Sequence, residues 1–229
     1  SIIEYCTIEY GTKIYAYGGF PFFNHSTIQF MSEKAIAGDY TTNVDLVIIN
    51  CNFYYNSKYV VDYQSSESST IRIIRGNKFS FNGNSDDYGD TYLLQINESE
   101  ISNNIFSSNT GGNSEDCYII KGRDNRIYNN QIINNEKAML SAGNSSTFSN
   151  IFYNNNIGTS GLIDYNNNRI DILDSVYFNL FVNNSGGSVF DIWEMDGGYI
   201  KNNIIAGNEG STIIKLRGGY GFGNDNINF

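Results

Sequence analysis

The sequence contains little proline, little charge and almost no histidine. Its 229 residues include one proline (Pro21) and one histidine (His25), and only 17% are charged, against about 25% in ordinary soluble domains. No apolar run approaches the ~20 residues of a membrane-spanning helix. The formal net charge of −10 disfavours nucleic acid and anionic membrane surfaces as partners, because both attract clustered Lys and Arg. We therefore expect no nucleic-acid partner and no direct membrane insertion.

What the sequence does contain is an imperfect repeat of about 25 residues. Its most regular element is Phe or Ile, two variable residues and then Asn, which occurs seven times between Phe53 and Asn208. Two weaker copies surround Ile8 and Ile28 and lack the Asn. The asparagines of this first column are Asn56, Asn82, Asn109, Asn135, Asn155, Asn184 and Asn208. Such regularity is a strong signal even in an asparagine-rich chain.

A second asparagine column keeps the same register, two residues before each Phe or Ile. Its members are Asn77, Asn104, Asn130, Asn150, Asn179 and Asn203. Cys51 takes this position in one repeat. Each repeat then holds about three short segments with alternating apolar residues, separated by Asn, Gly and Ser.

These patterns predict an all-β solenoid. Short segments with period-two apolar positions are strands, and a repeat of this size cannot bury its apolar face unless repeats stack. Stacking places equivalent residues ~4.8 Å apart on neighbouring strands. Asn suits the corners because it tolerates left-handed backbone geometry, and stacked amides can bond from coil to coil.

We expect one domain over residues 1–229, with weaker repeats in 1–49 and clear repeats in 50–229. About nine coils of three short strands fit this length. Both ends consist of strand-like residues without a polar or helical cap, and solenoids need such caps. The sequence therefore suggests a fragment of a longer chain.

The columns resemble the right-handed parallel β-helix repeats of the pectin-lyase-like superfamily. Within that superfamily they most resemble the polymorphic-membrane-protein type, known for Phe-x-x-Asn and Gly-Gly-Ala-Ile motifs. The best match is Phe181-Val-Asn-Asn184 followed by Gly186-Gly187-Ser188-Val189. The resemblance implies a right-handed coil and an extracellular or cell-surface location, with a structural or adhesive role.

One polar column could form a binding site. It follows the apolar pair in each repeat and comprises Asp62, Gln95, Lys121, Ser141, Asp164, Asp191 and Lys215. We expect a solvated strand face here. Asp164 and Asp191 fall on neighbouring coils, so their carboxylates could lie ~5 Å apart and hold Ca²⁺, contact a glycan or act as acid and base. Lys215 on the next coil could neutralise Asp191, and we expect no cofactor apart from this Ca²⁺ alternative.

Other candidate residues favour ordinary structural roles. The acidic Asp86-Asp87 pair is expected in a solvated loop, and His25 at a corner has no companion nucleophile motif. The sequons at Asn24, Asn97, Asn144 and Asn183 permit glycosylation without demonstrating it.

The three cysteines, Cys6, Cys51 and Cys117, predict free thiols. Cys6 and Cys51 occupy equivalent positions two coils apart, a separation of ~10 Å, which is too long for a disulfide. No metal-binding spacing is present among the cysteines.

A column of apolar residues immediately precedes the inward residues of one segment. It comprises Val60, Leu93, Ile119, Met139, Leu162, Val189 and Ile213. We favour a corner at which two successive residues point inward. The alternative is an exposed stripe that binds a partner.

The repeats specify architecture, and no catalytic constellation accompanies them. The leading hypothesis is a non-enzymatic extracellular or cell-surface segment that serves as adhesin, spacer or assembly subunit, with other protein subunits or cell-surface glycans as partners. One alternative is a carbohydrate-active lyase or hydrolase that uses Asp164 and Asp191. Another is a glycan-binding module that uses stacked tyrosines and Trp193.

Overall fold

The computed structural model describes residues 1–16, 19–38, 45–63, 71–83, 91–111, 117–166, 175–193, 199–210 and 212–217. Within these ranges all regular secondary structure is β-strand, arranged in three parallel sheets. No helix in the described ranges has the length and apolar character needed to cross a bilayer. The acidic pair Asp86-Asp87 lies outside the described residues.

Sheet A contains nine described strands, most of them three residues long. They are β1 (Ile2–Glu4), β4 (Phe22–Asn24), β7 (Leu46–Ile49), β10 (Arg72–Arg75), β13 (Glu100–Ser102), β16 (Arg126–Tyr128), β19 (Ser146–Phe148), β22 (Ser175–Tyr177) and β25 (Tyr199–Lys201).

Sheet B also contains nine described strands, and they carry the Phe and Ile residues of the sequence motif. They are β2 (Thr7–Glu9), β5 (Thr27–Gln29), β8 (Asn52–Tyr54), β11 (Lys78–Ser80), β14 (Ile105–Ser107), β17 (Gln131–Ile133), β20 (Ile151–Tyr153), β23 (Leu180–Val182) and β26 (Ile204–Ala206).

Sheet C has longer strands, and two of its described strands, β27 and β28, both pair with β24. The strands are β3 (Lys13–Ala16), β6 (Lys34–Gly38), β9 (Tyr59–Tyr63), β12 (Thr91–Ile96), β15 (Cys117–Arg123), β18 (Ala138–Gly143), β21 (Asn156–Asn166), β24 (Ser185–Trp193), β27 (Glu209–Gly210) and β28 (Ile214–Arg217).

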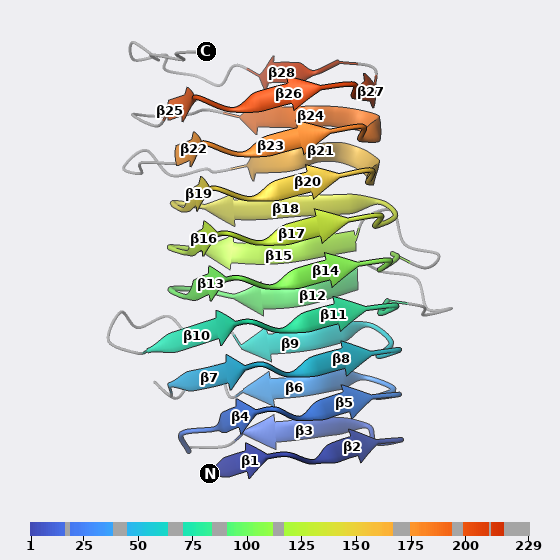
Figure 1. The fold of residues 1–229 in the computed structure, drawn as a ribbon, viewed down its shortest axis with the longest axis vertical. Helices are drawn as coiled ribbons and strands as arrows, with labels where there is room; N and C mark the ends of the chain where they lie inside the picture. The colour runs from blue at the N-terminus through green and yellow to red at the C-terminus, as the bar shows by residue number, and fades with distance from the viewer. Residues whose placement is uncertain are drawn as a thin grey trace.

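The chain passes from sheet A to sheet B to sheet C and then returns to sheet A one level higher, so that coils stack into a rod (Figure 1). This arrangement confirms the predicted all-β parallel solenoid with three strands per coil. The right-handed winding stays a prediction.

The middle residue of each short strand points inward and forms the core. Phe53, Phe79 and Phe106 are fully buried on successive strands of sheet B, and their ring centroids are 4.7 and 4.8 Å apart. The Phe and Ile anchors of the repeat from Phe53 to Phe181 are thus interior residues, as predicted. Rings stacked at these distances are in contact from one coil to the next.

In sheet C the predicted corner with two inward residues is confirmed. Val60 and Val61 are both fully buried, as are Leu93 and Leu94. The same holds for the later pairs up to Val189 and Phe190, while Ile213 in the last described coil remains 37% exposed. The apolar column is therefore part of the core and not a partner-binding stripe.

Candidate functional site

Two asparagine ladders line the first corner, between sheets A and B, and the second corner, between sheets B and C. In the second-corner ladder, Asn109 Nδ2 donates to Asn135 Oδ1 at 2.9 Å and to the carbonyl oxygen of Phe79 at 3.0 Å. The backbone N–H of Asn109 donates to the same Asn135 Oδ1 at 3.0 Å. The same pattern continues from Asn56 to Asn208, and from Asn77 to Asn203 at the first corner. All thirteen predicted column asparagines are thus structural and bond from coil to coil.

The predicted reason for asparagine at these corners is wrong in one respect. The residue with positive φ is the one immediately before the ladder asparagine, such as Asn103 (φ 56°) before Asn104 or Phe81 (φ 57°) before Asn82. The ladder asparagines themselves do not have positive φ. They are selected because one amide both donates and accepts, which allows each to satisfy two neighbouring coils.

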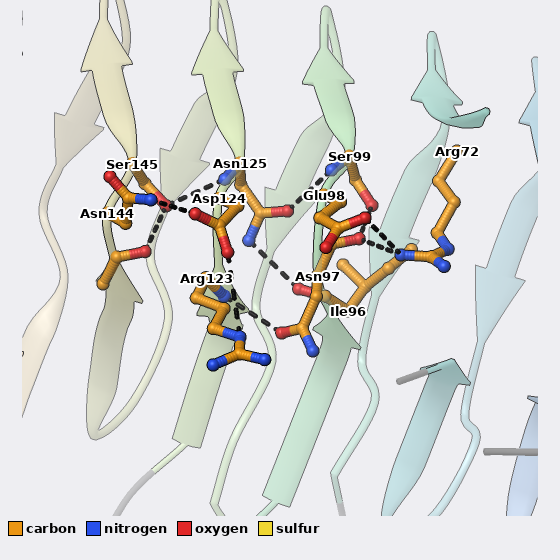
Figure 2. Close-up of polar contacts among 11 residues, drawn as sticks. Arg72, Ile96, Asn97, Glu98, Ser99, Arg123, Asp124, Asn125, Asn144 and Ser145 are labelled. Atoms are coloured by element: carbon orange, nitrogen blue, oxygen red, sulfur yellow. Dashed lines mark hydrogen bonds and ion pairs between the residues drawn. The ribbon is translucent and has the colours of Figure 1, made fainter. Parts of the chain in front are cut away.

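A third, mixed ladder lies at the corner between sheets C and A (Figure 2). The backbone N–H of Ser99 donates to Asn125 Oδ1 at 3.0 Å, and the N–H of Asn125 donates to Ser145 Oγ at 3.0 Å. Asn125 Nδ2 also donates to the carbonyl oxygen of Ile96 at 3.0 Å. Sequence reasoning missed this ladder. The signal was available, because Ser99, Asn125 and Ser145 each lie two residues before an inward residue of sheet A.

Arg72 occupies the position below this mixed ladder and points into the rod. It pairs in register with the buried Leu46, and its side chain is fully buried. Nη1 donates to the carbonyl oxygen of Asn97 at 2.8 Å and lies 4.0 Å from the Glu98 carboxylate. Nε and Nη2 have no hydrogen-bond partner in the described structure. Burial lowers the pKa of Arg72, and the nearby Glu98 opposes that shift.

Charged and amide side chains cluster on the outside of the third corner (Figure 2). The Nε atom of Arg123 is 3.7 Å from Asp124, and Asn144 Nδ2 donates to the same Asp124 carboxylate. Asn97 Oδ1 accepts the backbone N–H of Arg123 at 3.0 Å. Each acid in this cluster has a basic or amide neighbour. The arrangement stabilises the corner and engages Asn97 Oδ1 and Asn144 Nδ2, both of which belong to sequon residues.

The structure brings together the carboxylates predicted to form a site. Asp164 on β21 pairs in register with Asp191 on β24, and Asp191 pairs with Lys215 on β28. Lys215 Nζ lies 3.7 Å from the Asp191 carboxylate. This contact gives Asp191 a cationic neighbour, as expected. In the described part of the chain, no group of three or more His, Cys, Asp or Glu side chains could hold a metal ion.

The expectation of a solvated face along this polar column is wrong for two of its members. Asp62 is 1% exposed and Asp191 is 2% exposed. Each of these carboxylates has a lysine partner. Asp62 pairs with Lys34 one coil below, and Asp191 pairs with the more exposed Lys215 one coil above. A buried carboxylate needs such a cationic partner, because desolvation penalises an unpaired charge.

His25 lies at a corner and the cysteines are unpaired, as predicted. The imidazole of His25 stacks on Tyr5 at 5.0 Å, at a corner where His25 has φ 47°. All three cysteines are free thiols. Cys51 lies at the foot of the first-corner ladder, where its backbone N–H donates to Asn77 Oδ1 at 2.8 Å. Burial raises the pKa of the Cys51 thiol to about 11.

Aromatic side chains also form ladders on the outside of the rod, and they include stacked tyrosines such as the glycan-binding alternative expected. Tyr10, Phe30, Tyr55 and Phe81 stack at the second corner with centroid distances of 5.0, 5.4 and 5.4 Å. A second ladder of Tyr59, Tyr92 and Tyr118 lies on sheet C, with Lys121 close to two of its rings. The flat ring faces inside these ladders contact one another, so mainly ring edges face outward.

Fold and ladders together define a parallel β-solenoid repeat protein with asparagine-lined corners. No family model matches the chain, and no curated protein sequence is similar to it. Among solved structures, HetL resembles it with a TM-score of 0.31 and 7% identity, covering 92% of this chain and 88% of HetL. HetL is a pentapeptide repeat protein involved in heterocyst differentiation regulation from the cyanobacterium Nostoc sp. strain PCC 7120. Similarity at this level gives no information about function.

Proposed function

We propose that the chain is a non-enzymatic segment of an extracellular or cell-surface protein, serving as a spacer, adhesin or assembly subunit. The observation that carries the proposal is the continuity of the two asparagine ladders. Both run through successive coils and bond the amides and backbone of each coil to the next. Cooperative polar columns of this kind favour a stiff rod. With nine described strands in sheet B, the described part of the rod is ~40 Å long at the usual strand spacing.

We also propose that the repeats are of the polymorphic-membrane-protein type of the pectin-lyase-like superfamily, and that the coil is right-handed. Support comes from the register of the Phe-x-x-Asn motif, whose Phe53, Phe79 and Phe106 are aligned on successive strands. Other protein subunits are the favoured partners. A glycan that stacks on aromatic rings needs an open ring face, and the outer ladders leave mainly ring edges.

The test of location is labelling of intact cells of the native source with a membrane-impermeant amine reagent. We expect the chain to be labelled without lysis, while an internal marker protein remains unlabelled. Labelling that requires lysis would overturn the proposed location.

A polysaccharide lyase or hydrolase is the second candidate, because Asp164 and Asp191 are register neighbours on adjacent strands. Incubation with acidic polysaccharides, with and without Ca²⁺, distinguishes the two. We expect no new reducing ends and no unsaturated product. Turnover that is lost in Asp164→Asn and Asp191→Asn would replace the structural proposal with the enzymatic one.

A further inference from the structure

The outer face of sheet B changes character halfway along the rod. In the first four strands the outward positions are mostly polar, and they include Glu9 and Lys78. In β14, β17, β20, β23 and β26, eight of the ten outward residues are apolar. These ten residues, called here the aliphatic face, are Ile105, Ser107, Gln131, Ile133, Ile151, Tyr153, Leu180, Val182, Ile204 and Ala206.

All ten residues of the aliphatic face are at least partly exposed. Ile105 is 37% exposed, Ile151 38%, Tyr153 43% and Ile204 62%. The strand register aligns the ten residues in two columns along the rod. Single exposed apolar residues are common on soluble proteins, but a contiguous apolar patch marks an interaction site.

The absence of charge on this face and the spacing of its side-chain rows indicate what kind of partner it fits. None of the ten residues is charged, although the whole chain has a net charge of −10. Side-chain rows on this face repeat at the ~4.8 Å strand spacing. The face of a second solenoid with the same spacing can set each of its rows opposite one of these rows over all five strands. A helix repeats every ~5.4 Å and cannot keep this register over five strands.

We propose that the aliphatic face packs against the same face of a second copy of this chain, with the two rods antiparallel. This inference rests on the proposed role as an assembly subunit. A twofold axis along β20 brings Ile151 against its own copy and places Ile105 opposite Ile204. The charged first half of sheet B then lies outside the contact. A parallel pairing would instead bring the charged first half of sheet B, with Glu9 and Lys78, into the contact, and burying those charges is unfavourable.

The size of the face sets the expected affinity. Five strands and their corners bury on the order of 400 Å² per copy, against about 800 Å² per partner in a standard stable interface. We therefore expect reversible dimerisation at about 0.1–1 mM, and tighter association where several such faces are displayed together.

Sedimentation equilibrium from about 10 µM to 1 mM tests the proposal over the range in which such weak complexes dissociate. Wild-type protein should pass from monomer to dimer, and Ile151→Lys should stay monomeric. Thr27→Lys adds the same charge at the equivalent outward position of β5 and should dimerise like wild type. Wild-type protein that stays monomeric throughout, or Ile151→Lys that still dimerises, would overturn the proposal.

A charge-pair experiment tests the antiparallel orientation. Ile105→Lys alone should weaken the dimer at least tenfold, and adding Ile204→Glu should restore it, because the two positions face each other. If the double variant dimerises no better than Ile105→Lys, the antiparallel arrangement is wrong. Circular dichroism of each variant controls for folding. Failure here leaves the labelling test of the proposed function unaffected.

Discussion

The first two corners of the rod differ from the third. At the first and second corners, one residue type recurs at an inward position and forms an unbroken ladder. At the third corner, the equivalent position holds Leu46, Arg72, Ser99, Asn125 and Ser145 in successive coils. Asn and Ser can accept the backbone N–H of the coil below, whereas Arg only donates. In the described residues the mixed ladder runs from Ser99 to Ser145, and the side chain of Arg72 offers no acceptor that could extend it to Leu46.

The largest expected effect comes from breaking a regular ladder. Asn104→Ala removes the acceptor of the Asn77 backbone and amide, and the donor to the Ile74 carbonyl. With several buried groups left unbonded, we expect a loss of about 4 kcal/mol in the free energy of unfolding, measured by urea denaturation. Asn154→Ala is the control at the outer corner, where the exposed Asn154 side chain donates to Asn134. Because Asn154 has φ 53°, alanine is strained there, and we expect this variant to lose about 1 kcal/mol. Equal losses for the two variants would contradict the distinction between inner and outer asparagines.

The foot of the first-corner ladder gives a pH dependence. Burial raises the pKa of the Cys51 thiol from an ordinary value of 9.0 to about 11. The thiol is uncharged when protonated, so its full contribution to stability is present below pH 9. It is lost between pH 9 and 11, where the unfolded chain releases the proton first. We expect wild type to lose up to about 2.5 kcal/mol more than Cys51→Ser over this range. Parallel pH curves for the two proteins would refute the prediction.

At the third corner, Arg72 and Glu98 should respond unequally to substitution. Glu98→Gln removes the counter-charge of a buried guanidinium, and we expect it to cost about 2 kcal/mol. Arg72→Met replaces that guanidinium with an apolar chain where Leu46 already lies one coil below. We expect its stability to stay within about 1 kcal/mol of wild type. Thermal melts of both variants show which one is less stable. A larger loss of stability for Arg72→Met than for Glu98→Gln would show that the ion pair is net stabilising.

The smallest expected effect lies in the core beside the third corner. Thr147 is fully buried in register with Ile127 and Val176, and its Oγ1 has no hydrogen-bond partner in the described structure. Thr147→Val keeps the shape and removes the unbonded hydroxyl. We expect a gain of about 1 kcal/mol in chemical denaturation, with Thr147→Ser as a destabilised comparison. A loss for Thr147→Val would indicate an internal water bonded to this hydroxyl.

The regular corners could be predicted from sequence and the third could not, for physical reasons. Identical residues at a fixed offset, such as Asn104 and Asn130, reveal a column directly. At the third corner, different side chains, such as those of Asn125 and Ser145, accept equivalent backbone hydrogen bonds. The column is therefore visible only once the coils are aligned. The inward direction of Arg72 contradicts the usual preference of arginine for the surface. The burial of Asp62 depends on its tertiary surroundings, which the alternation of apolar residues does not report.

The amide-to-amide hydrogen bonds of the two ladders all run in one direction. Each ladder amide donates to the amide one coil nearer the C-terminus, from Asn56 through Asn208 and from Asn77 through Asn203. Bonds in such a series polarise one another, so the rod has unlike ends. During evolution, duplication or deletion of a whole coil of about 25 residues preserves this order. A coil with the opposite direction would place an amide N–H group against another N–H group in each ladder. The solenoid can therefore gain or lose whole coils, but no coil can be reversed.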